Sequence, residues 1–205
     1  MARRTKEDAE QTRLAILESA LKTFYEKGFS RTTFDEIAKR INLTKGAVYW
    51  HFRNKADIIA ALISQKMAEQ EKYYPSSTPN DLVSLREAIK NRALNIEKDE
   101  EFRRFLFFMN YRMEWSEAVL DNVWPKISGM VKLSDQKLYN CLLHIKDNGC
   151  IKPETDIKSL QEILLCLWKG CLNHYIINRN KKTNLTQTIM NGFDAIMAGI
   201  KMEKN

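Results

Sequence analysis

The segment that follows Thr44 brings together residue types that suit contact with another macromolecule. It reads Lys-Gly-Ala-Val-Tyr-Trp-His-Phe, and its periodicity predicts a helix of about two turns over residues 45–52. Val48 and Phe52 share one side of this helix and can anchor it. The residues on the other side and its flanks are Gly46, Ala47, Tyr49, Trp50 and His51. Exposed aromatic groups usually await a partner and small residues permit close approach, so this face suits the major groove of DNA.

Two more predicted helices hold this segment in place. A helix over residues 6–27 carries an apolar stripe and serves as a brace. A short helix over residues 34–41 begins after Thr33, which starts a capping-box pattern. Asn42 tolerates the backbone of a tight turn, and Thr44 is a good cap for the next helix. Two short helices joined by a tight turn have the layout of a helix-turn-helix.

Positive charge is concentrated at the start of the chain. The net charge is +7 over 205 residues, and residues 1–57 hold 12 basic and 8 acidic side chains. Arg3 and Arg4 precede any helical period, and we expect them to form a basic arm that reaches phosphates or a minor groove. Taken alone, such a run is more typical of a solvated tail.

The composition predicts an all-α protein of about nine helices. Only 7 glycines and 4 prolines occur, too few for the turns of an all-β fold, and no Gly-rich nucleotide-binding fingerprint is present. A hydrophobic fraction of 44% supports a folded core. The remaining helices are expected near residues 55–74, 82–98, 100–115, 117–148, 157–179 and 185–201. Pro125 should kink or interrupt the helix that contains it.

Two stretches carry a specific resemblance to a known family. Thr33-Phe-Asp-Glu-Ile-Ala, with Leu43-Thr-Lys-Gly-Ala-Val-Tyr-Trp-His-Phe-Arg-Asn-Lys-Ala-Asp57, resembles the TetR family of bacterial transcriptional regulators. The opening Met-Ala-Arg-Arg-Thr-Lys and the run from Thr44 to Phe52 look most like AcrR-type multidrug-efflux repressors. The match covers the first 57 residues or so, and the rest is similar only in length and helix layout.

The resemblance implies an all-helical homodimer, with a helix-turn-helix domain over residues 1–57 and a ligand-binding and dimerisation domain over residues 58–205. It places Thr33 and Lys55 at phosphates. The residues implied to meet bases and backbone are Thr44, Lys45, Gly46 and Ala47, and those implied to press on backbone and sugars are Tyr49, Trp50 and His51. Chemically, a lysine can donate to guanine and an alanine can contact a thymine methyl. Trp50 could instead pack on a neighbouring helix, and His51 could be bonded locally.

Aromatic and methionine side chains crowd the helix expected over residues 100–115. Apolar residues occupy more than one of its faces, so it either packs on two sides or lines an adaptable pocket. The residues expected to line such a pocket are Phe105, Phe108, Met109, Tyr111 and Met113, with Trp168, Cys171 and Tyr175 from a later helix. The effector expected there is a small hydrophobic or aromatic molecule.

The last two predicted helices carry apolar faces that suit a four-helix interface between two copies. The residues expected at this interface are Leu160, Leu164, Leu167, Ile189, Phe193 and Ile196. The alternative is that these residues close the core of their own protomer. A dimer would hold two recognition helices ~34–36 Å apart, as a pseudo-palindromic operator requires.

No metal, cofactor or catalytic site is expected. Cys141 with His144, and Cys171 with His174, could hold zinc in principle, but no tight spacing links the two pairs. Buried thiols and ordinary helix histidines explain them better. The three histidines of the chain are not paired in sequence with a nucleophile or an acid motif, which argues against an enzyme.

The function predicted from the sequence is that of a ligand-responsive transcriptional regulator. We expect a repressor that binds an operator in double-stranded DNA as a homodimer, is released by a small-molecule effector, and controls an efflux system. The polar, basic opening and the lack of any apolar run of ~18–20 residues predict a cytoplasmic protein with no membrane partner. The alternative is a helical small-molecule-binding protein or enzyme that uses the aromatic C-terminal cavity.

Overall fold

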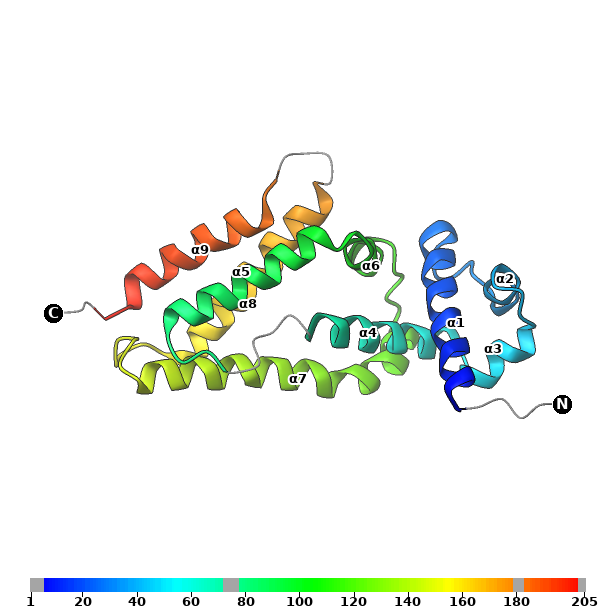
Figure 1. Cartoon of the computed structure of the whole chain (residues 1–205), viewed down its shortest axis with the longest axis horizontal. Coiled ribbons are helices and arrows are strands. Elements are labelled where there is room, and N and C mark those ends of the chain that lie inside the picture. Colours follow the sequence, from blue (N-terminus) through cyan, green and yellow to red (C-terminus); the bar gives the residue numbers. More distant parts are fainter. Residues whose placement is uncertain (1–5, 72–77, 179–182, 203–205) are drawn as a thin grey trace. The chain divides into compact units, whose positions relative to one another are not determined.

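The computed structural model describes residues 6–71, 78–178 and 183–202. Within those ranges the chain forms nine helices and one isolated bridge between Ile151 and Lys201, with no other strand pairing (Figure 1). The helices are α1 (Lys6–Lys27), α2 (Phe34–Arg40), α3 (Lys45–His51), α4 (Lys55–Glu71), α5 (Leu82–Lys98), α6 (Glu100–Tyr111), α7 (Glu117–Asp147), α8 (Ile157–Ile177) and α9 (Leu185–Ile200). The predicted all-α fold class is confirmed.

By packing, the chain forms two compact units. Unit 1 consists of Met1–Met67 and Phe105–Gly129, and unit 2 of Ala68–Arg104 and Met130–Asn205. Unit 1 extends beyond residue 57, because most of α4, most of α6 and the first turns of α7 pack with the N-terminal helices. The boundary at residue 57 between a DNA-binding and a ligand-binding domain stays a prediction. None of the described helices has the length and apolarity needed to cross a bilayer.

The core of unit 1 is built on α1. Leu17 and Phe24 are fully buried, and the Phe24 ring stacks on Phe108 of α6 with centroids 5.8 Å apart. The Ser19 hydroxyl is buried too, and it donates to the carbonyl of Ile37 in α2 at 2.8 Å. Each fully buried Leu or Phe contributes about 1.5–3 kcal/mol. The apolar stripe of α1 is therefore what fixes the short helices to the brace.

The core of unit 2 joins α5, α7, α8 and α9. Its members include Leu85, Leu142, Leu164 and Phe193, one from each helix. In Figure 1, α9 runs alongside α5 with α8 close by, and the structure has direct contacts between α9 and both of them. The chain segment after α9 returns to the α7–α8 turn, where the Lys152 N–H donates to an α9 carbonyl at 2.9 Å.

The end of α6 differs from the prediction. The helix ends at Tyr111 rather than near residue 115, because the N–H groups of Arg112 and Met113 both donate to the carbonyl of Phe108. Two donors on one carbonyl close the last turn and divert the chain. Met113 and Trp115, both expected on the helix, therefore lie in the turn that follows it.

The sequence predicted that Pro125 would kink or interrupt its helix. Interruption is wrong, since α7 continues through Pro125 from Glu117 to Asp147. A proline inside a helix removes one backbone hydrogen bond, and the remaining ladder of a long helix can carry that loss. The neighbouring Lys126 ammonium adds a bond of its own, to the carbonyl of Asn122 at 2.8 Å.

Candidate nucleic-acid interface

The helix-turn-helix is built from α2, α3 and the turn between them. The Thr33 hydroxyl accepts the Glu36 N–H at 3.3 Å, and the Glu36 carboxylate accepts the Thr33 N–H at 2.9 Å, which completes the predicted capping box. The Thr44 hydroxyl accepts the Ala47 N–H at 3.2 Å. Between the helices, Asn42 has a φ of 54°, the left-handed conformation that its side chain tolerates. These local bonds set the angle at which α3 leaves the turn.

The two sides of α3 differ as the helical wheel predicts. Val48 is fully buried and Phe52, just after the helix, is 4% exposed, so both anchor it to the core. Trp50 is 73% exposed and Tyr49 is 52% exposed. The alternative in which Trp50 packs on a neighbouring helix is therefore wrong. Its indole instead meets the edge of the His51 ring, with centroids 4.5 Å apart.

The start of α3 is open to solvent. Lys45 and Gly46 are exposed and Ala47 is half-buried. A Cβ placed on Gly46 would have only the Thr44 hydroxyl near it, at 3.8 Å, and the backbone there is ordinary helix. Internal packing thus gives no reason for a glycine at this position, whereas close approach of an external surface does. Arg3 and Arg4, the expected basic arm, lie outside the described residues.

Tyr49 links the exposed face to the core. Its ring packs on Phe34, the buried first residue of α2, with centroids 4.7 Å apart. The Lys45 ammonium lies over the same Tyr49 ring, 5.6 Å from its centroid. Phe34 was not among the residues expected at the site, although an aromatic residue at the start of α2 was visible in the sequence.

Lys55 is held inward, at the start of α4. Its ammonium donates to the carbonyls of Phe29 at 2.7 Å and Ser30 at 2.9 Å, and it lies 4.8 Å from the centroid of the Phe29 ring. Burial lowers the pKa of the Lys55 ammonium. In this state the side chain ties α4 to the turn after α1, and it would have to leave both carbonyls to reach a phosphate.

The start of α2 holds the negatively charged Glu36 carboxylate, with the positively charged Lys27 ammonium beside it. The Lys27 ammonium donates to Glu36 at 2.6 Å. This bond and those from Thr33 lower the pKa of the Glu36 carboxyl to about 2. A phosphate that approaches Thr33 therefore also approaches an ionised carboxylate, and Lys27 is the cation that offsets it.

The turn after α6 and the start of α7 contact the N-terminal helices. The Arg112 guanidinium donates to a carbonyl in the last turns of α1 at 2.9 Å. Glu114 accepts a short hydrogen bond from the Ser30 hydroxyl, and Lys126 pairs with Asp57 at 2.7 Å. No local sequence pattern predicts these contacts, because the partners lie 69 to 87 residues apart.

The expected effector-site residues of α6 belong to unit 1. Phe105, Phe108 and Met113 are buried there, Met109 is half-buried and Tyr111 is 39% exposed. Because the Phe108 ring stacks on α1, part of this set also serves as core.

The expected effector-site residues of α8 belong to unit 2. Trp168, Cys171 and Tyr175 are all half-buried. The Arg92 guanidinium lies over the Trp168 indole, 4.5 Å from the ring centroid. Burial raises the pKa of the Cys171 thiol, as expected for an inert side chain.

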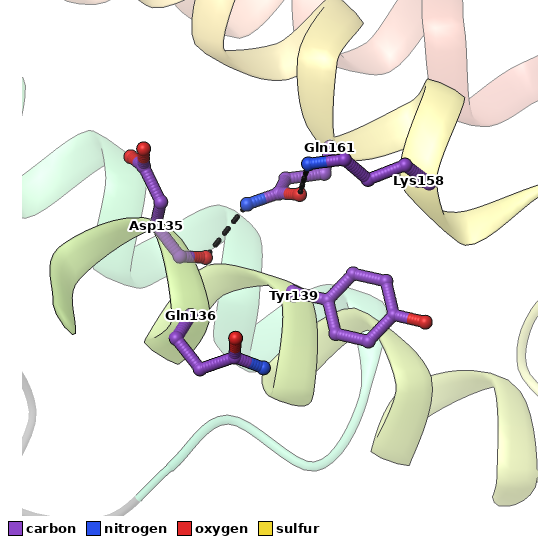
Figure 2. Close-up of a pocket in the computed structure, with 5 residues that line it drawn as sticks. All are labelled: Asp135, Gln136, Tyr139, Lys158 and Gln161. Atoms are coloured by element: carbon purple, nitrogen blue, oxygen red, sulfur yellow. Dashed lines mark hydrogen bonds between the residues drawn. The ribbon is translucent and has the colours of Figure 1, made fainter. Parts of the chain in front are cut away.

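A separate pocket of unit 2 is lined mainly by charged and amide side chains, with one tyrosine (Figure 2). It has a volume of about 320 Å³ and is lined by Asp135, Gln136 and Tyr139 of α7 and by Lys158 and Gln161 of α8. The buried Gln161 amide donates to the Asp135 carbonyl at 2.6 Å and accepts from the Lys158 ammonium at 3.1 Å. These bonds brace α8 against α7 and satisfy the buried amide.

The residues expected at the dimer interface are mostly inside their own protomer. Leu160, Leu164, Ile189 and Phe193 are at most 6% exposed. Leu160, Leu164 and Phe193 belong to the unit 2 core, and the half-buried Leu167 and Ile196 pack against it. The alternative, closure of the protomer core, accounts for the four buried residues. The face that α8 leaves exposed consists of Lys158, Ser159, Glu162, Ile163, Cys166, Lys169, Gly170, Asn173, His174 and Ile177. Within it, one stripe at helical spacing is Ser159, Ile163, Cys166, Gly170, Asn173 and Ile177.

The cysteine and histidine pairs do not converge. Cys141 is 4% exposed and its thiol donates to the carbonyl of Pro79, while burial raises its pKa to about 11. His144 and His174 are exposed. Over residues 6–71, 78–178 and 183–202, no three or more His, Cys, Asp or Glu side chains are grouped as a metal site requires.

Residues 16–62, from α1 to α4, match the family model described as bacterial regulatory proteins, tetR family. The transcriptional regulator AcrR of Shigella flexneri is 39% identical over 109 residues, which cover 52% of this chain and 51% of AcrR. In that comparison the chain spans about half the length of its relative. The transcriptional repressor BepR of Brucella suis is 29% identical over 208 residues, which cover 98% of this chain and 92% of BepR.

The fold of the whole chain is similar to that of a solved repressor. NalD, the secondary repressor of the MexAB-OprM multidrug efflux pump in Pseudomonas aeruginosa, superposes with a TM-score of 0.81 at 24% identity, over 96% of this chain and 100% of that one. This likeness concerns the fold alone. Residues 16–62, which hold the capped helix-turn-helix, therefore form an N-terminal domain of the kind found in the tetR family of bacterial regulatory proteins.

Proposed function

We propose that the protein is a transcriptional repressor that binds a pseudo-palindromic DNA operator as a homodimer and is released by a small hydrophobic or aromatic effector. The observation that carries the proposal is the exposed face of α3. Trp50 and Tyr49 stand in solvent beside Gly46, whose lack of a side chain has no internal reason. A surface of this kind is complementary to a groove and costly to leave without a partner.

Dimerisation through the exposed stripe of α8 follows from the same proposal. Ile163 is 50% exposed and Ile177 is 54% exposed, and they lie on one face with the small residues Cys166 and Gly170. Small residues let two helices approach closely, and the isoleucines supply apolar area. Two copies joined in this way would present two α3 helices to one operator.

Our proposal for the effector and the regulated genes is based on proteins similar to this chain. BepR is a repressor by name, and NalD is a repressor of a multidrug efflux pump. We propose that this protein likewise controls an efflux system, and that its effector contacts aromatic residues of unit 1 such as Tyr111. An aromatic or otherwise hydrophobic compound suits such contacts best.

The test is selection of bound duplexes from a randomised DNA pool by the purified full-length protein, followed by titration of the enriched sequence at several salt concentrations. We expect a pseudo-palindrome bound at least 10³-fold more tightly than unrelated DNA, as specific regulators are. Lys45→Ala should lower this ratio. A folded dimer that enriches no sequence would overturn the proposal.

A further inference from the structure

We propose that Tyr49 is a positioning residue that holds the Lys45 ammonium where it reads a base. The inference rests on the proposed function, because it concerns how the exposed face of α3 tells one DNA sequence from another. It assigns to the contact among Phe34, Tyr49 and Lys45 a role in sequence discrimination, distinct from any contact of Tyr49 with the DNA backbone.

The first part of the argument is that the Tyr49 ring is itself fixed. Phe34 is 6% exposed and lies at the capped start of α2, so its position is determined by the core and by the capping box. The Tyr49 ring packs on it with centroids 4.7 Å apart and planes inclined at 55°. A tilted aromatic contact at this distance has a preferred geometry. The phenol ring is thus a platform, although 52% of Tyr49 remains exposed.

The second part of the argument is that the Lys45 ammonium lies on this fixed Tyr49 ring. Lys45 and Tyr49 are one helical turn apart on α3, and the ammonium lies 5.6 Å from the ring centroid, within the range of a cation–π contact. Among the described residues, no acidic side chain pairs with Lys45. The ring is therefore what selects among the rotamers of this long side chain.

The consequence concerns the cost of binding. A free lysine loses rotamer freedom when it is fixed against a base, and this loss weakens the specific complex. A lysine that already rests on a fixed ring loses less. Because a nonspecific phosphate contact tolerates many rotamers, the benefit applies mainly to the cognate base pair. A cation–π contact at an exposed site corresponds to about 2–5-fold in an equilibrium constant.

The experiment is a double-mutant cycle on the full-length protein. The probes are the duplex enriched by selection and its variants with one base pair changed, with dissociation constants measured by fluorescence anisotropy. The proteins are the wild type, Tyr49→Phe, Tyr49→Leu, Lys45→Ala and the double variant Tyr49→Leu/Lys45→Ala. Phenylalanine keeps the ring and its contact with Phe34, and leucine removes the ring, so the pair separates ring from hydroxyl.

We expect Lys45→Ala to relax the preference at one base pair of each half-site. Tyr49→Leu should lower the preference at that same base pair about 2–5-fold, and Tyr49→Phe should leave it unchanged. The double variant should match Lys45→Ala at that position, because the ring then has no ammonium to place. If Tyr49→Leu only damaged the structure of α3, it would instead weaken binding to all duplexes by the same factor.

Two results would overturn the inference while the proposed function stands. One is a loss in Tyr49→Leu that is the same at every base pair and additive with Lys45→Ala. The other is an equal loss of preference in Tyr49→Phe and Tyr49→Leu, which would assign the effect to the hydroxyl. If the wild type itself shows no sequence preference, the proposed function fails first. Thermal unfolding of each variant checks that it is folded.

Discussion

At the scale of single residues, Glu36 carries both a structural and an electrostatic role. Its carboxylate accepts hydrogen bonds from the Lys27 ammonium and from the Thr33 N–H at the start of α2. These bonds favour the ionised form and hold the pKa of the Glu36 carboxyl near 2. The same charge keeps phosphates at a distance unless Lys27 and the helix start outweigh it.

This predicts a defined acid sensitivity. Because the folded-state pKa of Glu36, about 2, is below the ordinary value of 4.5, its contribution to stability is complete above pH 4.5 and is lost as pH falls towards 2. We expect Glu36→Gln to have a lower thermal midpoint than the wild type at pH 6, with the two converging between pH 4.5 and 2. Calorimetry over this range measures it, and a constant difference at all pH values would contradict it.

Lys55 shows why a residue can match a family pattern and still behave differently in one state. The resemblance implies a phosphate contact, whereas here the ammonium is occupied by the carbonyls of Phe29 and Ser30. Hydrogen bonds from a charged group contribute more than neutral ones, so they hold the side chain inward. A phosphate contact by Lys55 remains a prediction, and it requires exchange of these carbonyls for the DNA.

At the scale of helices, the crossing of α8 and α9 depends on one glycine. A Cβ on Gly192 would lie 2.6 Å from a terminal methyl of Leu167 and 3.2 Å from the other. Such a methyl group can be accommodated only if the helices separate or Leu167 leaves its rotamer. The close approach of the two helices is thus a property of this position.

We expect Gly192→Ala to lower the free energy of unfolding by about 1–3 kcal/mol, as overpacking of a core does. Gly129→Ala is the matched control, since α7 has nothing within 4 Å of a Cβ at Gly129. That control should gain up to about 1 kcal/mol from helix propensity. Urea unfolding of the two variants and the wild type gives both values, and equal changes in the two would disprove the packing argument.

The contacts between the turn after α6 and the N-terminal helices also belong to this scale. Arg112, Glu114 and Lys126 lie far along the chain from the helix-turn-helix, yet they bond to α1, to Ser30 and to Asp57. A change in α6 or in the start of α7 therefore acts directly on the elements that hold α3. Such a segment is where an effector could bias DNA binding, provided that it binds the two states with different affinity.

At the scale of the whole molecule, the proposed homodimer requires a face that meets a second copy. The apolar residues with the strongest helical pattern on α8 and α9 are already in the protomer core, so they have little area left to bury. The exposed stripe of α8 remains, with Cys166 at its middle. Two α8 helices that cross there would bring two thiols together.

We therefore expect oxidation with copper phenanthroline to join two copies of the full-length protein through Cys166. A disulfide needs Cα atoms about 4.4–6.8 Å apart, so it reports the crossing point closely. The product is a band of twice the mass on a non-reducing gel. Cys166→Ser should abolish it, and Cys171→Ser should not. A dimer in solution that never cross-links at Cys166 would place the interface elsewhere.

The local features of the chain follow from the order of its residues alone. Helix starts at Thr33 and Thr44, the turn at Asn42 and the two sides of α3 follow from bonds and spacings within a few residues, and the structure confirms them. The short family motif is local for the same reason. Such a motif can be identified without reference to residues far away in the chain.

The partner that each apolar or charged side chain takes depends instead on how the helices pack together. Leu160 and Phe193 fit a protomer core and a dimer interface equally well by pattern, because periodicity gives the face of a helix and not its neighbour. Likewise, Lys55 finds carbonyls 25 and 26 residues earlier in the chain. Contacts of this range depend on how the helices pack, and packing is set by the summed fit of many side chains.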